Sequence, residues 1–190
     1  MRIDGNTEII AHIGYPTYAF RAPLIYNPWF AKVGINAIVV PMSCQLEPFP
    51  RFLCSVFHLG NIRGALITMP HKVTTVGLLD DVLPTAAIAG SCNAVRRLDD
   101  GRLQGNMFDG EGFVRGLKRK GFDPKGRRVL VVGAGGVGCA IAASLAAAGV
   151  LEMDLFDMND ASAKSLASRL LQHYPSMTIH TGSKDPAGYE

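Results

Sequence analysis

The stretch VLVVGAGGVGCAIAASLAAAGV, Val129–Val150, decides the fold of the second half of the chain. An apolar run leads into a cluster of glycines and then into an alanine-rich segment, which predicts a strand, a tight turn and a helix. The glycines fit G-x-G-x-x-G in the strand-turn-helix context of a dinucleotide site. The first makes the turn, the second lets the backbone approach a pyrophosphate, and the third lets helix and strand pack closely. The candidate cofactor-binding residues are Gly133, Ala134, Gly135, Gly136, Val137 and Gly138.

A second predicted strand, Met153–Asp157, ends in a carboxylate. Asp157 lies nineteen residues after Gly138, near the spacing of about 20 at which such folds place the acid that binds the ribose hydroxyls. Because a carboxylate there would repel a 2′-phosphate, we expect NAD rather than NADP as the cofactor. One alternative is a glycine turn needed only for packing, with Asp157 as the N-cap of the next helix. The turn alone also allows a flavin or an S-adenosyl cofactor.

The first half of the chain alternates short apolar runs with helical patterns, which predicts a parallel sheet with helices on both faces. The predicted strands are Ile9–Gly14, Ala37–Met42 and Gly64–Met69, and the predicted helices are Pro23–Gly34, Pro48–Gly60 and two short ones within 72–80 and 84–90. Residues 92–106 form a predicted hairpin that turns at Asp100 and Gly101. We expect another helix from Asp109 to about Lys120, followed by a polar linker. The predicted organisation is therefore a first domain over residues 1–108, a joining helix and linker over 109–126, and a second domain over 127–190.

Charge and cysteine content narrow the class of protein. The formal charge is only +3, which does not indicate a nucleic-acid surface. The basic run Lys118–Arg128 fits a solvated helix end and loop better than a patch for an anionic partner. The four cysteines have no CxxC spacing and lie in apolar surroundings, which predicts buried free thiols and a reducing compartment. No pattern indicates a metal site, a signal peptide or a membrane span, so we expect a cytoplasmic protein.

Four segments carry a more specific signal: ITMPHK (Ile67–Lys72), GSCNAV (Gly90–Val95), GNMFDGEGF (Gly105–Phe113) and GYPTYAFRAPLIYN (Gly14–Asn27). They resemble the shikimate dehydrogenase family, whose corresponding motifs are V-T-x-P-x-K, G-A-x-N-T-V, G-x-N-T-D-x-x-G-F and G-x-P-x-x-H-S-x-S-P-x-x-H-N. The resemblance covers nearly the whole chain. It implies an α/β fold with an N-terminal three-layer α/β substrate domain plus a partial Rossmann dinucleotide-binding domain.

The resemblance also implies roles for individual residues. Lys72 would be the catalytic lysine and Asp109 its paired carboxylate, while Thr68 and Asn93 would hydrogen-bond substrate hydroxyls. The chemistry is consistent, because oxidising a secondary alcohol needs a base for the O–H proton while hydride leaves the carbon. Taken singly, a lysine after a strand is usually solvated and an aspartate at a helix start is usually an N-cap. Their shared occurrence in matching motifs favours the active-site interpretation.

Two histidines lie near these motifs. His71 precedes Lys72 and could tune its charge, although a surface position is an equal alternative. His12 falls in an apolar strand, where a core histidine is more common than a ligand.

The chain departs from the family at the substrate carboxylate. Phe20 and Ala22 stand where the family has two serines that bind this group, and neither side chain can donate a hydrogen bond. An unpartnered buried carboxylate is costly, so we expect shikimate to bind poorly unless Arg21 supplies a partner. Leu66 and the pair Met107-Phe108 make the predicted pocket more apolar. We therefore expect another cyclic hydroxy acid or polyol as the substrate.

Three functions are compatible with these features. The first is an NAD(P)-dependent dehydrogenase acting on a CH–OH group, of the shikimate or quinate class, which by resemblance belongs to the shikimate pathway of aromatic amino acid biosynthesis. The second is a nucleotide-binding paralogue or fragment without catalysis. The third, a methyltransferase, is supported by the glycine turn alone. We expect a C-terminally truncated family member with a small-molecule substrate, no nucleic acid and no membrane partner, and a homodimer is one option for its assembly.

Overall fold

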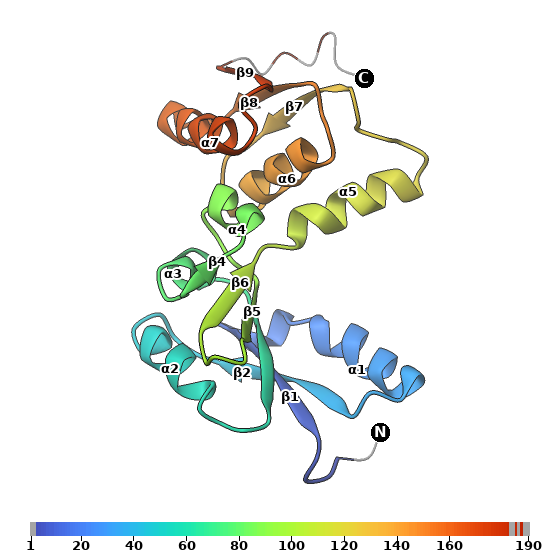
Figure 1. Ribbon diagram of the computed structural model, residues 1–190, viewed down its shortest axis with the longest axis vertical. Coiled ribbons are helices and arrows are strands. Elements are labelled where there is room, and N and C mark those ends of the chain that lie inside the picture. The colour runs from blue at the N-terminus through green and yellow to red at the C-terminus, as the bar shows by residue number, and fades with distance from the viewer. Residues whose placement is uncertain (1–2, 183–184, 186, 188–190) are drawn as a thin grey trace. The chain divides into compact units, whose positions relative to one another are not determined.

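The computed structural model describes residues 3–182, 185 and 187. The chain forms two compact units, one of residues 1–82 with 92–105 and the other of 83–91 with 106–190 (Figure 1). The elements of the first unit are β1 (Glu8–Gly14), η1 (Thr17–Ala19), α1 (Ala22–Val33), β2 (Ala37–Ser43), α2 (Phe49–Val56), β3 (Ile62–Ile67), α3 (Lys72–Val76), β4 (Asp81–Val82), β5 (Ala94–Arg97) and β6 (Leu103–Asn106). Those of the second are α4 (Pro84–Ala89), α5 (Asp109–Arg119), β7 (Arg128–Val132), α6 (Gly136–Ala147), β8 (Glu152–Phe156), α7 (Asp160–His173) and β9 (Thr178–Thr181).

A six-stranded sheet in the order β2-β1-β3-β5-β6-β4 forms the centre of the first unit. Strand β1 pairs in parallel with β2 and β3, so that Ile13 lies between Met42 and Ile67. Side chains alternate along β1 between the two faces of the sheet. This alternation buries Ala11 and Ile13 in the layer that α2 covers, and turns Ile10 and His12 towards the opposite layer.

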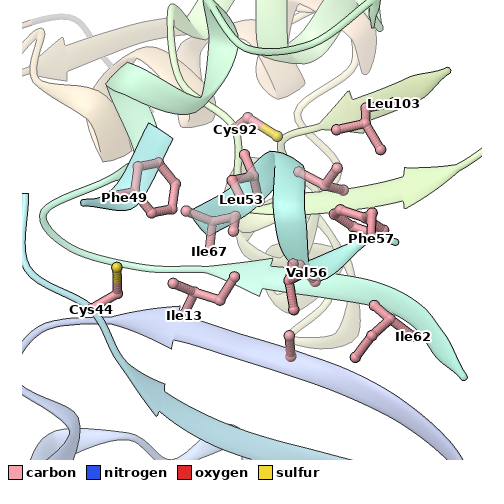
Figure 2. Close-up of a cluster of buried hydrophobic side chains, with 13 residues drawn as sticks. Ile13, Cys44, Phe49, Leu53, Val56, Phe57, Ile62, Ile67, Cys92 and Leu103 are labelled. Carbon is pink, nitrogen blue, oxygen red and sulfur yellow. The ribbon is translucent and has the colours of Figure 1, made fainter. Parts of the chain in front are cut away.

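Helices α1 and α2 cover opposite faces of this sheet (Figure 1). On one face Phe30 of α1 packs with Val39 of β2. On the other face Leu53 and Val56 of α2 lie over Ile67 and its neighbours (Figure 2). The expected three-layer α/β arrangement is thereby confirmed, because each amphipathic helix buries its apolar side against one face of the sheet.

One strand departs from the expected parallel pairing. β5 runs antiparallel to β3, with Ala65 opposite Val95. A tight turn joins β5 to β6, which forces the two strands into opposite directions. Gly101 adopts a left-handed backbone there (φ +88°), and the Asp100 carboxylate accepts the Arg102 N–H at 3.0 Å. The predicted hairpin is therefore confirmed, and it makes the sheet mixed.

The second unit contains a three-stranded parallel sheet in the order β7-β8-β9. Helix α6 connects β7 to β8, and α7 connects β8 to β9. Two right-handed crossovers in the same direction place both helices on one face of the sheet. Met153 and Leu155 of β8 and Leu166 and Leu170 of α7 are buried there. This is the mononucleotide half of a Rossmann fold, as expected.

Helices α4 and α5 also belong to the second unit, and both pack against α6. A Cβ added to Gly110 of α5 would lie 1.9 Å from the Ala140 carbonyl oxygen, so only glycine allows this approach of the two helices. The Arg169 guanidinium of α7 donates from Nε to the Ile88 carbonyl of α4 at 2.6 Å and from Nη1 to the Ser165 hydroxyl at 2.7 Å. Residues 83–91 are thereby held on the dinucleotide-binding fold by both packing and hydrogen bonds.

The ends of one helix and one strand, and the exposure of one cysteine, differ from the predictions. α2 ends at Val56 rather than Gly60, and β3 ends at Ile67, so Thr68 and Met69 lie beyond the strand. Cys54 is exposed, because it falls on the outer side of α2, whereas the other three cysteines are buried as expected. None of the helices that the structure describes is both long and apolar enough to cross a membrane.

Candidate active site

The carboxyl ends of β1 and β3 form the first part of the candidate site. The Thr68 N–H donates to the Ile13 carbonyl at 3.0 Å, and the Tyr15 N–H donates to the Met69 carbonyl at 3.0 Å. A Cβ added to Gly14 would lie 2.4 Å from the Thr68 methyl group and 2.8 Å from the tip of the Phe20 ring. Gly14 therefore allows a close approach of Thr68 and Phe20 at the edge of the sheet where open α/β proteins bind ligands.

Lys72 follows directly from this edge. The turn after β3 is closed by the His71 N–H, which donates to the Thr68 carbonyl at 3.0 Å, and Lys72 is then the first residue of α3. The Lys72 carbonyl accepts the Cys92 N–H at 2.9 Å, which fixes the lysine backbone to the segment leading into β5. The Lys72 side chain is half-buried.

Asn93 lies at the same edge, because β5 runs antiparallel to β3 and begins where β3 ends. The Asn93 carbonyl accepts the Ile67 N–H at 2.9 Å, and its side chain is half-buried. The structure thus brings the segment of Thr68 and Lys72 together with Asn93, which lies about twenty residues further along the sequence. An amine, a hydroxyl and an amide are the groups that can hold and deprotonate a polyhydroxylated ring.

Phe20 and His12 form an aromatic pair beside this cluster. Their ring centroids are 4.1 Å apart with a tilt of 31°. His12 is buried, and burial lowers the pKa of its imidazole. Within the described part of the chain, His12 Nδ1 finds no hydrogen-bond partner, so the expected core position is confirmed but the ring is less satisfied than core histidines usually are. Arg21, the other sequence-predicted residue here, is exposed immediately before α1.

The glycine turn of the second unit has one glycine in a left-handed conformation and one at a close backbone approach. Gly133 has φ +100°, a conformation that favours glycine, and a Cβ on Gly138 would lie 1.9 Å from the Gly133 carbonyl oxygen. Gly135 is different, because its backbone is extended (φ −77°, ψ −179°) and no atom of the described residues lies within 4 Å of an added Cβ. These protein contacts therefore do not require glycine at position 135. A ligand that approached the backbone there, at the N-terminus of α6, would require it.

The Asp157 carboxylate is bonded to this turn. Its Oδ2 accepts the Ala134 N–H at 2.7 Å, and its Oδ1 accepts the Asn159 N–H at 2.8 Å. These two N–H groups hold the pKa of the Asp157 carboxyl below its usual value. The N-cap of α7 is Asn159, which accepts the Ala161 N–H at 3.1 Å, so the alternative of Asp157 as the N-cap is wrong.

Asp109 is the first residue of α5 and is half-buried. It belongs to the second compact unit, whereas Lys72 belongs to the first. The pairing of their side chains therefore stays a prediction.

Two different family models match the two halves of the chain. Residues 13–95 match the family model described as the shikimate dehydrogenase substrate binding domain. This match runs from β1 to β5 and includes Thr68, Lys72 and Asn93. The chain is 36% identical over 169 residues to the shikimate dehydrogenase (NADP(+)) of Rubrobacter xylanophilus. The chain is thus similar to shikimate dehydrogenases over most of its length, and residues 13–95 match their substrate binding domain.

Solved structures of shikimate dehydrogenases are similar throughout the chain. The shikimate 5-dehydrogenase of Listeria monocytogenes, solved in complex with shikimate and NAD, superposes with a TM-score of 0.87 at 30% identity and covers 96% of this chain. The Thermus thermophilus enzyme, in complex with NADP(H) and shikimate, gives 0.80 at 28% identity and covers 95%. This chain spans 59% of the Rubrobacter protein and 63% of the Listeria structure. Residues 125–176 additionally match the ThiF family model, which covers the strand-turn-helix segment and the elements up to α7.

The predicted preference for NAD is wrong. Curated shikimate dehydrogenases similar to this chain in sequence, from Rubrobacter xylanophilus, Syntrophomonas wolfei and Geobacter metallireducens, are all named as NADP(+) enzymes. The physical reason lies in the hydrogen bonds of Asp157. Because both carboxylate oxygens already accept backbone N–H groups of the turn and of the loop before α7, the presence of this acid is explained without a ribose.

Sequence reasoning missed two features of the site. His71 is fully buried rather than at the surface, and its ring stacks on Phe49 with centroids 3.9 Å apart. Phe20 pairs with His12 rather than simply lacking a polar group. The partners are eight residues apart in one contact and 22 in the other, and no helical or strand periodicity of the sequence indicates either contact.

Proposed function

We propose that this chain acts as an NADP(H)-dependent dehydrogenase on a secondary alcohol of a cyclic hydroxy acid or polyol, in the shikimate and quinate class. The observation that carries the proposal is the convergence of Thr68, Lys72 and Asn93 at the carboxyl end of β3. The named function of the relatives supports it. By the same relationship we assign the reaction to the shikimate pathway of aromatic amino acid biosynthesis.

The residues have distinct roles in this proposal. Thr68 and Asn93 hydrogen-bond ring hydroxyls and fix the orientation of the ring. Lys72 takes the proton of the reacting hydroxyl, and Asp109 orients the lysine and that hydroxyl. Arg21 is the cation available to a substrate carboxylate. When bound, the nicotinamide dinucleotide supplies the hydride acceptor or donor.

The second half of the chain binds the dinucleotide. Backbone N–H groups of residues 135–138, at the N-terminus of α6, hold the pyrophosphate, and Asp157 keeps the turn in shape by accepting the Ala134 N–H. We assign residues 1–108 to substrate binding except for 83–91, which pack on the second unit, and we assign 109–126 to the connection and 127–190 to the cofactor. The free cysteines support a cytoplasmic location.

Exposed apolar side chains on α1 support a homodimer. Leu24, Ile25 and Trp29 are all more than half exposed, and such a face on a helix is typical of an interaction surface. Light scattering on the purified chain gives the mass directly. A monomer over the full concentration range would contradict this assignment.

Turnover by the full chain tests the proposal. Shikimate, quinate and uncharged cyclic polyols are offered with NADP(+), and reduced nicotinamide is followed by absorbance. Lys72→Met should lower the rate by about 100- to 10,000-fold, the usual contribution of a general base. Lys32→Met, an exposed lysine of α1, is the matched control and should leave the rate unchanged.

Binding separates this function from its alternative. Cofactor binding without turnover of any of these alcohols, and without any effect of Lys72→Met or Asp109→Asn, would identify a nucleotide-binding paralogue instead. Binding of neither cofactor nor ring alcohols would overturn the proposal.

A further inference from the structure

We propose that His71 is a positioning residue that fixes Lys72 for its role at the end of β3. The inference rests on the function proposed for Lys72. It starts from the burial of His71, whose side chain is completely enclosed although it lies next to the half-buried lysine.

One hydrogen bond of the ring defines which of its nitrogens donates. His71 Nε2 lies 2.8 Å from the Cys44 carbonyl oxygen, and because a carbonyl can only accept, Nε2 carries the hydrogen. Nδ1 is buried and has no partner among the described residues. The ring therefore acts at this site as a hydrogen-bond donor, through Nε2, to the Cys44 carbonyl.

The orientation of the His71 ring is fixed by stacking as well as by the hydrogen bond of Nε2. It stacks on Phe49, the first residue of α2, with an angle of 7° between the planes. Cys44, which accepts from the ring, itself donates its N–H to the Gly14 carbonyl at 3.0 Å. The imidazole is thereby held at the carboxyl ends of β1 and β2 and at the start of α2. Both of its partners, Phe49 and Cys44, belong to the core cluster of the first unit (Figure 2).

The backbone of His71 transmits this position to Lys72. Its N–H donates to the Thr68 carbonyl at 3.0 Å, and its carbonyl accepts the Thr75 N–H at 2.9 Å and the Thr75 hydroxyl at 2.8 Å. Both peptide groups of His71 are therefore held, one towards Thr68 and one towards α3. Since Lys72 is the next residue, the contacts of His71 with Cys44 and Phe49 determine the position of the Lys72 Cα atom relative to Thr68.

Two variants separate the hydrogen bond from the packing. His71→Phe keeps a ring for Phe49 but cannot donate to Cys44, whereas His71→Gln supplies an amide N–H that can. His58→Phe, an exposed histidine after α2, is the matched control. The readout is the rate at which trace acetic anhydride labels Lys72 relative to Lys32 in the full chain, measured by mass spectrometry, together with binding of shikimate and quinate by NMR.

His71→Phe should change the relative labelling of Lys72 by about threefold or more, as the loss of one buried hydrogen bond implies, and weaken ring-alcohol binding. His71→Gln should restore both, and His58→Phe should change neither. A folded His71→Phe protein with unaltered Lys72 labelling would overturn the inference, and so would a His71→Gln protein no better than His71→Phe. If His71→Phe does not fold, Phe49→Leu replaces it. This variant should also change the relative labelling of Lys72 and weaken ring-alcohol binding, and unaltered labelling would again overturn the inference.

Failure of the proposed function gives a different pattern. The labelling experiment needs no substrate, so it tests the positioning role of His71 even if the wild-type protein binds no ring alcohol. In that case a changed labelling rate of Lys72 in His71→Phe would support the positioning role, while the absence of binding would contradict the dehydrogenase assignment.

Discussion

Asp157 accepts the backbone N–H of Ala134 at 2.7 Å and so connects the end of β8 to the glycine turn after β7. The contact spans 23 residues of sequence and joins the two strand ends around which a dinucleotide would lie. The sequence spacing predicts that this carboxylate binds a ligand, whereas in the structure it accepts a hydrogen bond from the glycine turn of the protein itself.

Replacing Asp157 should therefore loosen the turn in a pH-dependent way. The folded pKa of Asp157 lies below its unfolded value, so the stabilisation is fully present above the unfolded value of about 3.9 and is lost as the pH falls through the folded value. Asp157→Asn should lower the melting temperature at neutral pH, and the difference from wild type should shrink in acid. Asp160→Asn, which removes an exposed carboxylate in the first turn of α7 and its ion pair with Lys164 but no bond to the glycine turn, is the control. Equal melting of Asp157→Asn and wild type at neutral pH would contradict the prediction.

Gly135→Ala should change the affinity for the cofactor without changing the stability of the fold. A Cβ at position 135 meets no atom of the described chain within 4 Å, so the variant should keep its melting temperature. It should weaken NADP(H) binding by about tenfold or more, because the methyl group occupies space that the pyrophosphate needs. Gly138→Ala is the contrast, since its Cβ would clash with the Gly133 carbonyl and destabilise the fold itself. Calorimetric titration and thermal melting measure the two effects, and unchanged binding by Gly135→Ala would contradict the assigned pyrophosphate site.

Phe20 should act against substrates that carry a carboxylate. Its ring tip lies with the Thr68 methyl group against Gly14, so two apolar groups meet at this point of the sheet edge. Phe20→Ser should strengthen shikimate binding by about tenfold relative to that of an uncharged polyol, the value of roughly one charge-assisted hydrogen bond. Tyr18→Ser, on a side chain that is 87% exposed, should have no effect. NMR titration of both ligands provides the comparison, and an unchanged ratio of affinities would show that Phe20 does not select between them.

His12 should make the protein less stable in mild acid. Burial lowers the pKa of His12 in the folded state, so the unfolded chain binds the proton more readily. The stability that neutral His12 contributes is present above its unfolded value of about 6.5 and is lost as the pH falls through the folded value. His12→Phe should flatten this dependence in denaturant melts, whereas the exposed His173→Phe should not. Parallel curves for His12→Phe and wild type would contradict the expectation.

Ser91 and Thr75 offer a comparison of two buried hydroxyls. Within the described residues the Ser91 hydroxyl has no hydrogen-bond partner, whereas the Thr75 hydroxyl donates to the His71 carbonyl at 2.8 Å. Ser91→Ala should leave stability unchanged or raise it by up to about 1 kcal/mol, and Thr75→Val should lower it by about 1 kcal/mol. Urea unfolding measures both, and a loss of stability in Ser91→Ala would reveal a partner for its hydroxyl.

The regular elements could be predicted because each depends on residues that are close in sequence. The pattern Pro23 to Gly34 predicts a helix, and α1 ends before Gly34, which has the left-handed backbone (φ +76°) that such a position favours. The pair Asp100-Gly101 predicts the hairpin for the same local reason. Strand ends were less well predicted: Thr68 lies after β3, and although its N–H still donates to Ile13 of β1, its carbonyl accepts the His71 N–H of the following turn.

The sequence by itself determined the α/β alternation, the glycine turn and the set of polar residues in recognisable motifs, since periodicity, turn chemistry and motif spacing are properties of neighbouring residues. Only the tertiary structure decided what those residues contact. It made β5 antiparallel, buried His71 against Phe49 and Cys44, placed Phe20 on His12, and bonded Asp157 to Ala134. The physical reason is that burial and hydrogen-bond partnership arise between segments brought together by packing, and the free energy of those contacts depends on geometry that no local pattern specifies.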